Sequence, residues 1–365
     1  MNLKARLINN RIDSEILNTD KKTIFKWKVK DLDKMKWSKY PMIDSHLHIV
    51  NFKQETEWLK KLLYYMDKAN VKKWVIFWMP LRKMWSEHER ISPEYYLDDD
   101  TACYYDSFTD GIVAEEYIKL TKDEQKRFYP LICGFNPMDM NAISHIKNMY
   151  KFYPWVFCWI WEILLRHDDL TFMTQWEPPR LNNKAMYPIL EFAVEHDLPV
   201  IIHNNITSPG VSDHPKFLYE LEAILRDFPK ARIIFAHCGA SRRVYSPYYK
   251  KMIERLLNEY PALHVDYSWV VFDEIIMRSE ESVAEWVDLT EKFSDRILLW
   301  SDILWDWFHK IWFINNRFDK FLDLLTEKTR INLCINNAER LFSKKKNIVE
   351  CWKKRIFPKL EDFKH

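Results

Sequence analysis

The chain has 365 residues, 47% of them hydrophobic and 30% charged, which is the balance of a globular protein rather than a disordered one. Its net charge is only +2, too small to favour nucleic acid or an anionic membrane surface as the main partner. It contains no run of about eighteen apolar residues, so no membrane span is predicted. These properties favour a small-molecule substrate, with no nucleic acid and no membrane as partner.

The N-terminus and the cysteines indicate the cellular compartment. The first residues, MNLKARLINNRIDSEI, contain neither the apolar segment nor the cleavage site of a secretory signal. The six cysteines are scattered and form no CxxC motif, which favours reduced thiols packed as small hydrophobic groups. We therefore expect a cytoplasmic protein.

Eight short apolar runs recur along the chain from residue 41 onward. They are rich in β-branched and aromatic residues, and they do not alternate strictly between apolar and polar positions. Such runs are typical of strands that are buried on both faces of a parallel sheet. The predicted strands are residues 42–50, 73–80, 127–137, 155–164, 198–206, 231–239, 262–270 and 296–302.

Segments with helical periodicity separate these runs. The predicted helices are residues 57–69, 139–153, 183–197, 214–228, 248–260, 281–293 and a last one near 308–326. Eight strands that alternate with helices predict an α/β fold, the (β/α)8 TIM barrel. An open, doubly wound sheet is the competing arrangement, but it would require a glycine-rich phosphate loop, and the chain has only four glycines.

Several segments do not belong to this repeat. We expect residues 1–40 to form an N-terminal extension that packs against the barrel or against a second subunit, as in a homodimer. Residues 41–345 would form the barrel, and residues 346–365 a C-terminal tail helix. The long loops 81–110 and 165–182 are predicted to form a lid, because long ordered loops often cover a binding site.

Polar residues interrupt the apolar runs near their C-terminal ends, where a TIM barrel carries its functional side chains. His46 and His48 point to the same face of the first strand, because side chains alternate along a strand. Further residues of metal-binding type on later strands are Glu162, His203, His237, Asp266 and Asp302. Each alone has a simpler interpretation, such as a structural histidine or a helix cap. A metal centre requires the histidine pair of the first strand together with His203, His237 and Asp302, and the sequence has each of them.

Two of the few glycines, Gly134 and Gly239, stand at the ends of predicted strands. In a chain so poor in glycine, this position indicates backbone geometry that other residues cannot adopt.

The motifs MIDSHLH, IIH, FAHCG, WSD and INNAERLF resemble the amidohydrolase superfamily. The most similar branch is the amidohydrolase-related group that contains aminocarboxymuconate-semialdehyde decarboxylase and related hydrolases. The resemblance extends over about residues 41–342. It implies a divalent metal, usually zinc with Mn²⁺ or Fe²⁺ as alternatives. The ligands that it implies are His46, His48, His203 and Asp302.

The resemblance leaves the roles of two further residues open. His237 is either a ligand of a second metal or a catalytic group that polarises the substrate. Glu162 stands where many binuclear members carry a carboxylated lysine. A glutamate at this position either bridges two metals or, in a mononuclear site, contacts the substrate or a ligand. One ion is slightly favoured over two.

The implied reaction is hydrolysis of an amide, ester or lactone carbonyl through a metal-activated water, with Asp302 as the general base and His237 as the polarising group. Arg242 and Arg243 follow the sixth strand, where a guanidinium could clamp a substrate carboxylate in a fork. Arg166 and His167, after the fourth strand, are weaker candidates of the same kind. The implied substrate is a small molecule that bears a carboxylate.

Three alternatives remain open at this point. A non-oxidative decarboxylase of the same branch would use the same ligands. A TatD-like nuclease also places a glutamate on the fourth strand, but the acidic residues 98–100 in the predicted lid do not suit a polyanionic substrate. A catalytically inactive scaffold would be expected to lack a ligand, and the motifs lack none.

Overall fold

The computed structural model of the protein describes residues 38–85, 93, 96–97, 99, 101–106, 108–157, 159–171, 178–208, 210–211, 213–304 and 316–343. The predicted N-terminal extension, apart from residues 38–40, and the whole predicted tail helix lie outside these residues. So do residues 172–177 and most of residues 86–100. The domain boundaries, the lid and the homodimer therefore stay predictions.

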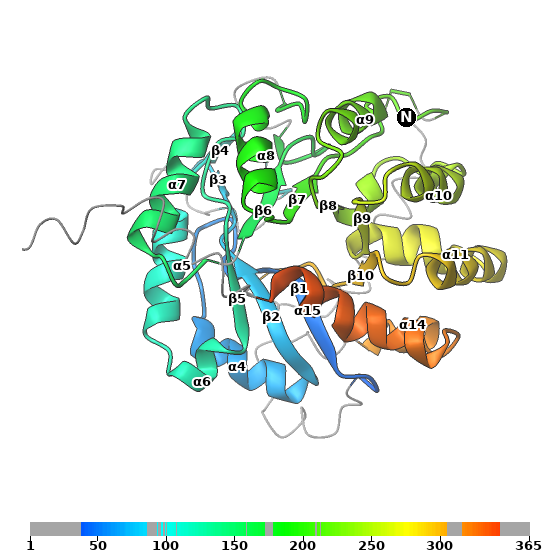
Figure 1. Ribbon diagram of the computed structural model, residues 1–365, viewed down its shortest axis with the longest axis horizontal. Coiled ribbons are helices and arrows are strands. Elements are labelled where there is room, and N and C mark those ends of the chain that lie inside the picture. The colour runs from blue at the N-terminus through cyan, green and yellow to red at the C-terminus, as the bar shows by residue number, and fades with distance from the viewer. Residues whose placement is uncertain are drawn as a thin grey trace, which may run out of the picture. The chain divides into compact units, whose positions relative to one another are not determined.

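A single parallel sheet of nine strand segments forms the centre of the fold (Figure 1). Its segments are β1 (Met42–His48), β2 (Val71–Phe77), β5 (Phe128–Ile132), β6 (Trp159–Leu164), β7 (Val200–His203), β8 (Ile233–Phe235), β9 (His264–Tyr267), β10 (Ile297–Leu299) and β11 (Ile303–Leu304). Their order is β10-β9-β8-β7-β6-β5-β2-β1-β11. Because β10 and β11 are two parts of one chain segment and lie at opposite ends of this order, the sheet closes on itself. The predicted eight-stranded TIM barrel is confirmed.

Each strand is shorter than its predicted run. The apolar runs continue past the strand ends into turns, and residues Ala236–Gly239, for example, form a 3-10 turn directly after β8. All seven residues of β1 are buried, as expected of a strand covered on both faces. The many tryptophans contribute to this core, and Trp74, Trp159, Trp286 and Trp300 are fully buried.

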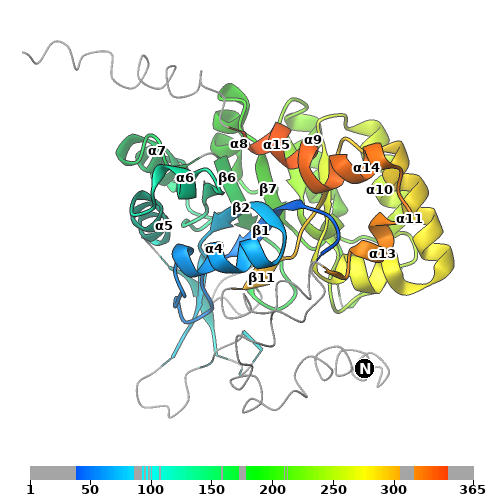
Figure 2. The ribbon, with the colours of Figure 1, turned by 90° about the horizontal axis from the view of Figure 1, so that it is seen from below.

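The six helices predicted between strands are all present. They are α4 (Leu59–Lys68), α7 (Ala142–Phe152), α8 (Met186–Glu195), α9 (Leu218–Asp227), α10 (Tyr249–Glu259) and α11 (Glu280–Lys292). Their apolar residues recur every three or four positions, and α10 thus buries Met252, Ile253, Leu256 and Leu257 on one face. Figures 1 and 2 show α10 and α11 side by side on one flank of the barrel.

The last predicted helix, near residues 308–326, falls partly outside the described residues. The described part that follows holds α13 (Asp319–Leu322), α14 (Glu327–Ile331), a π-helical turn at Asn332–Asn336, and α15 (Asn337–Phe342). Trp159 on β6 donates a hydrogen bond to the carbonyl of Phe342, at 3.1 Å, and so ties α15 to the barrel.

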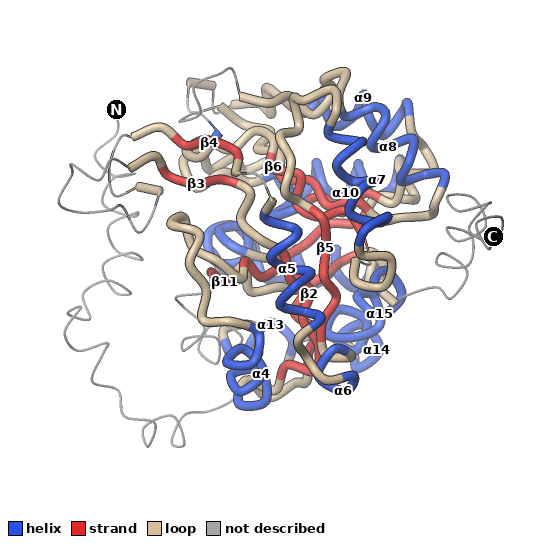
Figure 3. The backbone as a smooth tube through the Cα atoms, turned by 90° about the vertical axis from the view of Figure 1, so that its left-hand side faces the viewer, coloured by secondary structure: helices blue, strands red, loops and turns tan. Residues whose placement is uncertain are grey.

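The region after β2 differs from the long loop that we predicted. Two short strands, β3 (Leu81–Lys83) and β4 (Cys103–Tyr105), pair in antiparallel fashion away from the central strands β2 and β5 (Figure 3). Two unpredicted helices follow, α5 (Thr109–Ile118) and α6 (Lys122–Gln125). The start of α6 has a signal in the sequence, because TKDE forms a capping box between Thr121 and Glu124.

In the described part of the chain, no helix has the length and apolar character needed to cross a membrane.

Candidate metal centre

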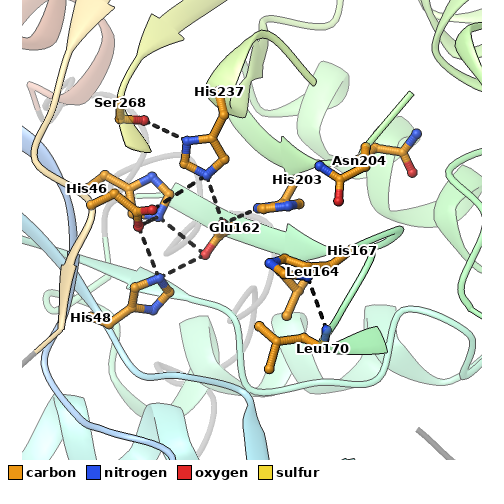
Figure 4. A network of polar contacts seen from close by, with 12 residues as sticks. His46, His48, Glu162, Leu164, His167, Leu170, His203, Asn204, His237 and Ser268 are labelled. Atoms are coloured by element: carbon orange, nitrogen blue, oxygen red, sulfur yellow. Dashed lines mark hydrogen bonds and ion pairs between the residues drawn. The ribbon is translucent and has the colours of Figure 1, made fainter. Parts of the chain in front are cut away.

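The structure gathers six of the seven candidate metal-binding side chains at the C-terminal ends of the barrel strands, and Figure 4 labels five of these six. His46 and His48 lie on β1, Glu162 on β6, His203 at the end of β7, His237 just after β8, and Asp302 between β10 and β11. All of them are buried except Asp302, whose side chain is 13% exposed. The arrangement brings residues from distant parts of the sequence into one cluster.

One side of the cluster consists of the two β1 histidines and two carboxylate oxygens. The Oδ1 of Asp302 lies 3.1 Å from the Nε2 of His46 and 3.5 Å from that of His48. The Oε2 of Glu162 lies 3.3 Å from both of these nitrogens. Ligand bonds of about 2.0–2.1 Å in tetrahedral zinc sites place neighbouring ligand atoms about 3.3 Å apart. The donor atoms therefore have the spacing of a metal's ligand shell.

The other side of the cluster is formed by the second oxygen of each carboxylate. The Oε1 of Glu162 lies 3.0 Å from the Nδ1 of His203 and 3.9 Å from the Nε2 of His237. The Oδ2 of Asp302 lies 3.8 Å from the same nitrogen of His237. Glu162 thus stands between two groups of imidazoles.

Hydrogen bonding fixes the orientation of His237. Its Nδ1 lies 2.7 Å from the hydroxyl of Ser268, which itself donates to the carboxylate of Asp266. The hydroxyl has only one proton to give, so it accepts from the Nδ1–H of His237. Burial lowers the pKa of His237 to about 3, so that the ring is neutral. The Nε2 lone pair therefore faces Glu162 and Asp302.

The buried carboxylates of the cluster require a compensating positive charge. Burial opposes ionisation of Glu162, but the surrounding histidines, His46 first, hold the pKa of this carboxyl well below its usual range. Burial likewise opposes the charge on His46, and the carboxylates of Glu162 and Asp302 nevertheless raise its pKa to about 9. A proton on His46 and a divalent cation are two ways to balance these buried anions. The residues present therefore fit a metal ion.

Sequence reasoning missed the role of Asp44, which precedes the histidines at the same two-residue spacing. Its Oδ1 accepts hydrogen bonds from the backbone N–H of His46 and of Ser301, both at 3.2 Å. The second bond joins β1 to the break between β10 and β11. Asp44 therefore helps to position Asp302, and its signal in the sequence is the alternation of Asp44, His46 and His48 on one face of a strand.

The backbone is strained at residues that follow barrel strands and lie in or beside the cluster. His237, Trp269 and Asp302 have φ values of 53°, 49° and 54°, a region that L-amino acids other than glycine rarely adopt. Such strain costs of order 1–3 kcal/mol a residue and clusters at functional sites.

The two glycines at strand ends have different reasons for being there. Gly239 has a φ of 68°, so the expectation of special backbone geometry is confirmed, and a Cβ there would also overlap the ring of Phe235. Gly134 does not have a positive φ, and the expectation is wrong for it. A Cβ at Gly134 would instead overlap the hydroxyl of Thr109, so close packing is what requires this glycine.

The arginines named from the sequence lie in different surroundings. Arg242 lies over the ring of Trp269, 4.9 Å from its centroid, and 5.5 Å from the centroid of Tyr96. Arg243 forms an ion pair with Asp169. Arg242 is therefore better placed than Arg243 to bind a substrate carboxylate.

The two weaker candidates after β6 also differ from each other. Arg166 forms a buried ion pair with Glu220, at 2.8 Å, and covers the ring of Phe217, so its role is structural. His167 lies inside the site, with its ring stacked on that of His203 at a centroid distance of 4.8 Å.

Comparisons with known proteins bear on the family and the fold of the chain. A family model described as Amidohydrolase matches residues 168–344. Among proteins with curated functions, none matches the chain.

Solved structures with the same fold include a putative amidohydrolase from Staphylococcus aureus, at 13% identity and a TM-score of 0.51, covering 82% of this chain and 99% of that one. A 2,6-dihydroxybenzoate decarboxylase from Rhizobium has 16% identity and a TM-score of 0.50, with 84% and 99% covered. An uncharacterised TIM-barrel protein from Bordetella bronchiseptica has 14% identity and a TM-score of 0.50, with 82% and 97% covered. The family match over residues 168–344, the closed barrel and its cluster of histidines and carboxylates support a TIM barrel of the amidohydrolase superfamily.

Proposed function

We propose that the protein is a metal-dependent hydrolase that acts on an amide, ester or lactone carbonyl of a small, carboxylate-bearing substrate. The observation that carries this proposal is the spacing of 3.1–3.5 Å between the β1 imidazole nitrogens and the oxygens of Glu162 and Asp302. These groups are buried at the end of the barrel where such enzymes perform their chemistry.

The donor set suits zinc best, with Mn²⁺ or Fe²⁺ as alternatives, because neutral imidazoles and carboxylates bind all three. His46, His48, Asp302 and Glu162 would hold a first ion. The second oxygen of Glu162 faces His203 and His237, which supports a second ion between these residues. We therefore favour two ions over the single ion that the sequence slightly favoured.

A divalent ion acts as a Lewis acid that polarises a carbonyl and lowers the pKa of water. Asp302 is the most exposed member of the cluster and its pKa lies below the usual range, because His46 and His237 outweigh the effect of burial. It is thus an ionised carboxylate that can accept the proton of the attacking water and return it to the leaving group. The bare Nε2 of His237 suits a ligand better than a donor to the carbonyl.

Arg242 would bind the substrate carboxylate. Its guanidinium lies against the ring of Trp269, and the centroid of that ring is 5.1 Å from the centroid of the His237 ring. Arg242 therefore lies next to the candidate metal-binding residues. The aromatic face orients the guanidinium, and a guanidinium edge is suited to a bidentate contact with a carboxylate.

The proposal is tested with zinc-loaded enzyme and a panel of carboxylate-bearing amides, esters and lactones. Hydrolysis of at least one class is expected, with a loss of kcat of about a hundredfold or more in Asp302→Asn, since general acid–base catalysis contributes about 10²–10⁴-fold. His214→Ala is the matched control, because this histidine is exposed and, among the described residues, its side chain pairs with its neighbour Asp213. Release of CO2 in place of hydrolysis would assign the decarboxylase alternative instead.

A further inference from the structure

His167 has a fixed protonation pattern in the structure. It follows β6, its side chain is buried, and the residue is only 4% exposed. Its Nδ1 accepts hydrogen bonds from the backbone N–H groups of Asp169 and Leu170, both at 3.0 Å. A nitrogen that accepts two such bonds carries no proton, so the neutral ring carries its proton on Nε2. The burial of the ring, with His203 and Arg242 close by, also holds the pKa of His167 well below its usual range.

The remaining N–H of His167 lies within the candidate site. The ring stacks on His203, and its centroid is 5.5 Å from that of Trp269, which carries Arg242 on its face. In Figure 4 the hydrogen bond to Leu170 leaves the ring on the side away from Glu162, so the opposite edge faces the cluster. Among the described residues no group accepts a hydrogen bond from Nε2.

The Nε2 of His167 is not among the fully enclosed polar atoms that lack a partner, so its N–H is open to water or to a ligand that enters the site. The loop from residue 168 to 171 provides backbone donors for Nδ1 and thereby directs the other nitrogen into the site. A histidine that served only to support this loop would not need to present a second polar atom there.

We propose that His167 is a specificity-determining residue that donates its Nε2–H to an acceptor oxygen of the substrate, beside the oxygen group bound by Arg242. A neutral donor next to a cationic one suits a substrate whose carboxylate is accompanied by a carbonyl or second carboxylate oxygen. This inference rests on the proposed function, since it assigns a role in the same site.

Two variants separate this role from a structural one. In His167→Asn the side-chain oxygen can take the place of Nδ1 and keep the backbone bonds of the loop, but the donor is lost. In His167→Gln the amide nitrogen can take the place of Nε2 and keep the donor, but the loop bonds are lost. A role in substrate binding predicts that Gln preserves affinity and Asn does not. A role in the loop alone predicts the reverse.

The experiment uses the zinc-loaded full-length enzyme, with benzoate and benzamide as probes in titration calorimetry. Benzoate affinity should fall roughly ten- to a hundredfold in His167→Asn, as for loss of a hydrogen bond to a charged group, and by less than threefold in His167→Gln. Benzamide, which is neutral, should lose affinity in His167→Asn but not in Arg242→Gln. Unchanged benzoate binding in His167→Asn, or a wild type that binds neither probe, would overturn the inference.

A second measurement does not depend on any reaction. Long-range ¹H–¹⁵N spectra of the zinc-loaded enzyme with ¹⁵N-labelled histidine should contain one neutral ring with its proton on Nε2 that is missing from both variants. A proton on Nδ1 of that ring would contradict the proposal. If this signal and the probe binding are found while no substrate is hydrolysed, the proposed function fails and the binding role of His167 stands.

Discussion

The Nε2 of His46 lies 3.1 Å from the Oδ1 of Asp302, and this contact joins the first strand of the barrel to the last. The two residues are far apart in the sequence, and only closure of the sheet brings them together. The register of Leu47 opposite Ile303 brings β1 and β11 together at this point. The same closure that completes the barrel therefore completes the candidate metal centre.

Removal of the β1 histidines should abolish metal binding. In the double variant His46→Ala/His48→Ala, two of the closely spaced donors are lost, and we expect protein purified without added metal to lose its transition metal, measured by elemental mass spectrometry. His214→Ala should keep the wild-type content. A wild type that contains no metal and takes up no zinc on reconstitution would count against the whole site.

The contacts of the two carboxylate oxygens of Glu162 lead to a separate prediction about the number of bound ions. His203 faces only the Oε1 side, so His203→Gln should reduce the metal content from about two equivalents to one and leave the first ion in place. Glu162→Gln removes the carboxylate that both sides share, and both equivalents should weaken. Elemental analysis after dialysis provides the measurement. A fall from one equivalent to none in His203→Gln would instead indicate a single ion bound by His203.

The fold and most of the cluster could be predicted because both follow from periodicity. Strands buried on both faces give recognisable apolar runs, and a polar residue near the end of such a run stands out. His46, His48 and Asp302 were found in this way. The pairing of β3 with β4 could not be predicted, since each strand has only three residues and some twenty residues separate them.

The roles of the arginines could not be predicted either, because they depend on partners from other segments. Arg166, Arg242 and Arg243 look alike in the sequence. Only the fold pairs Arg166 with Glu220 and Arg243 with Asp169, and places Arg242 against an aromatic face beside the cluster. The tautomer of His167 depends in the same way on the path of its loop.

Gly239 should tolerate no side chain. In Gly239→Ala the new methyl group would overlap Phe235, and the φ of 68° would strain an L-residue. We expect a loss of about 2–5 kcal/mol in the free energy of unfolding, or failure to fold, from strain and overpacking together. Gly210→Ala is the matched control, because the nearest atom to its Cβ would be 4.0 Å away. Equal denaturation midpoints for the two variants would refute the argument.

His264 should make the stability of the protein depend on pH independently of the metal centre. It begins β9 at the end of the barrel away from the cluster, and its Nδ1–H donates to the carbonyl of Ala262 at 3.1 Å. Burial lowers its pKa to about 4, against about 6.5 in an unfolded chain. Between these values the unfolded chain binds a proton that the folded protein does not bind. The stability that the neutral ring contributes is therefore complete above pH 6.5 and is lost as the pH falls towards 4.

The substitution His264→Asn isolates this effect, because the asparagine amide can still donate to Ala262 but does not titrate. The free energy of unfolding of the wild type, measured by denaturant titration, should fall relative to the variant by about 3 kcal/mol between pH 7 and pH 4. Protonation of the histidines in the cluster affects both proteins equally and cancels in the difference. A difference that stays constant with pH would mean that His264 is already protonated, or accessible to protons, in the folded barrel.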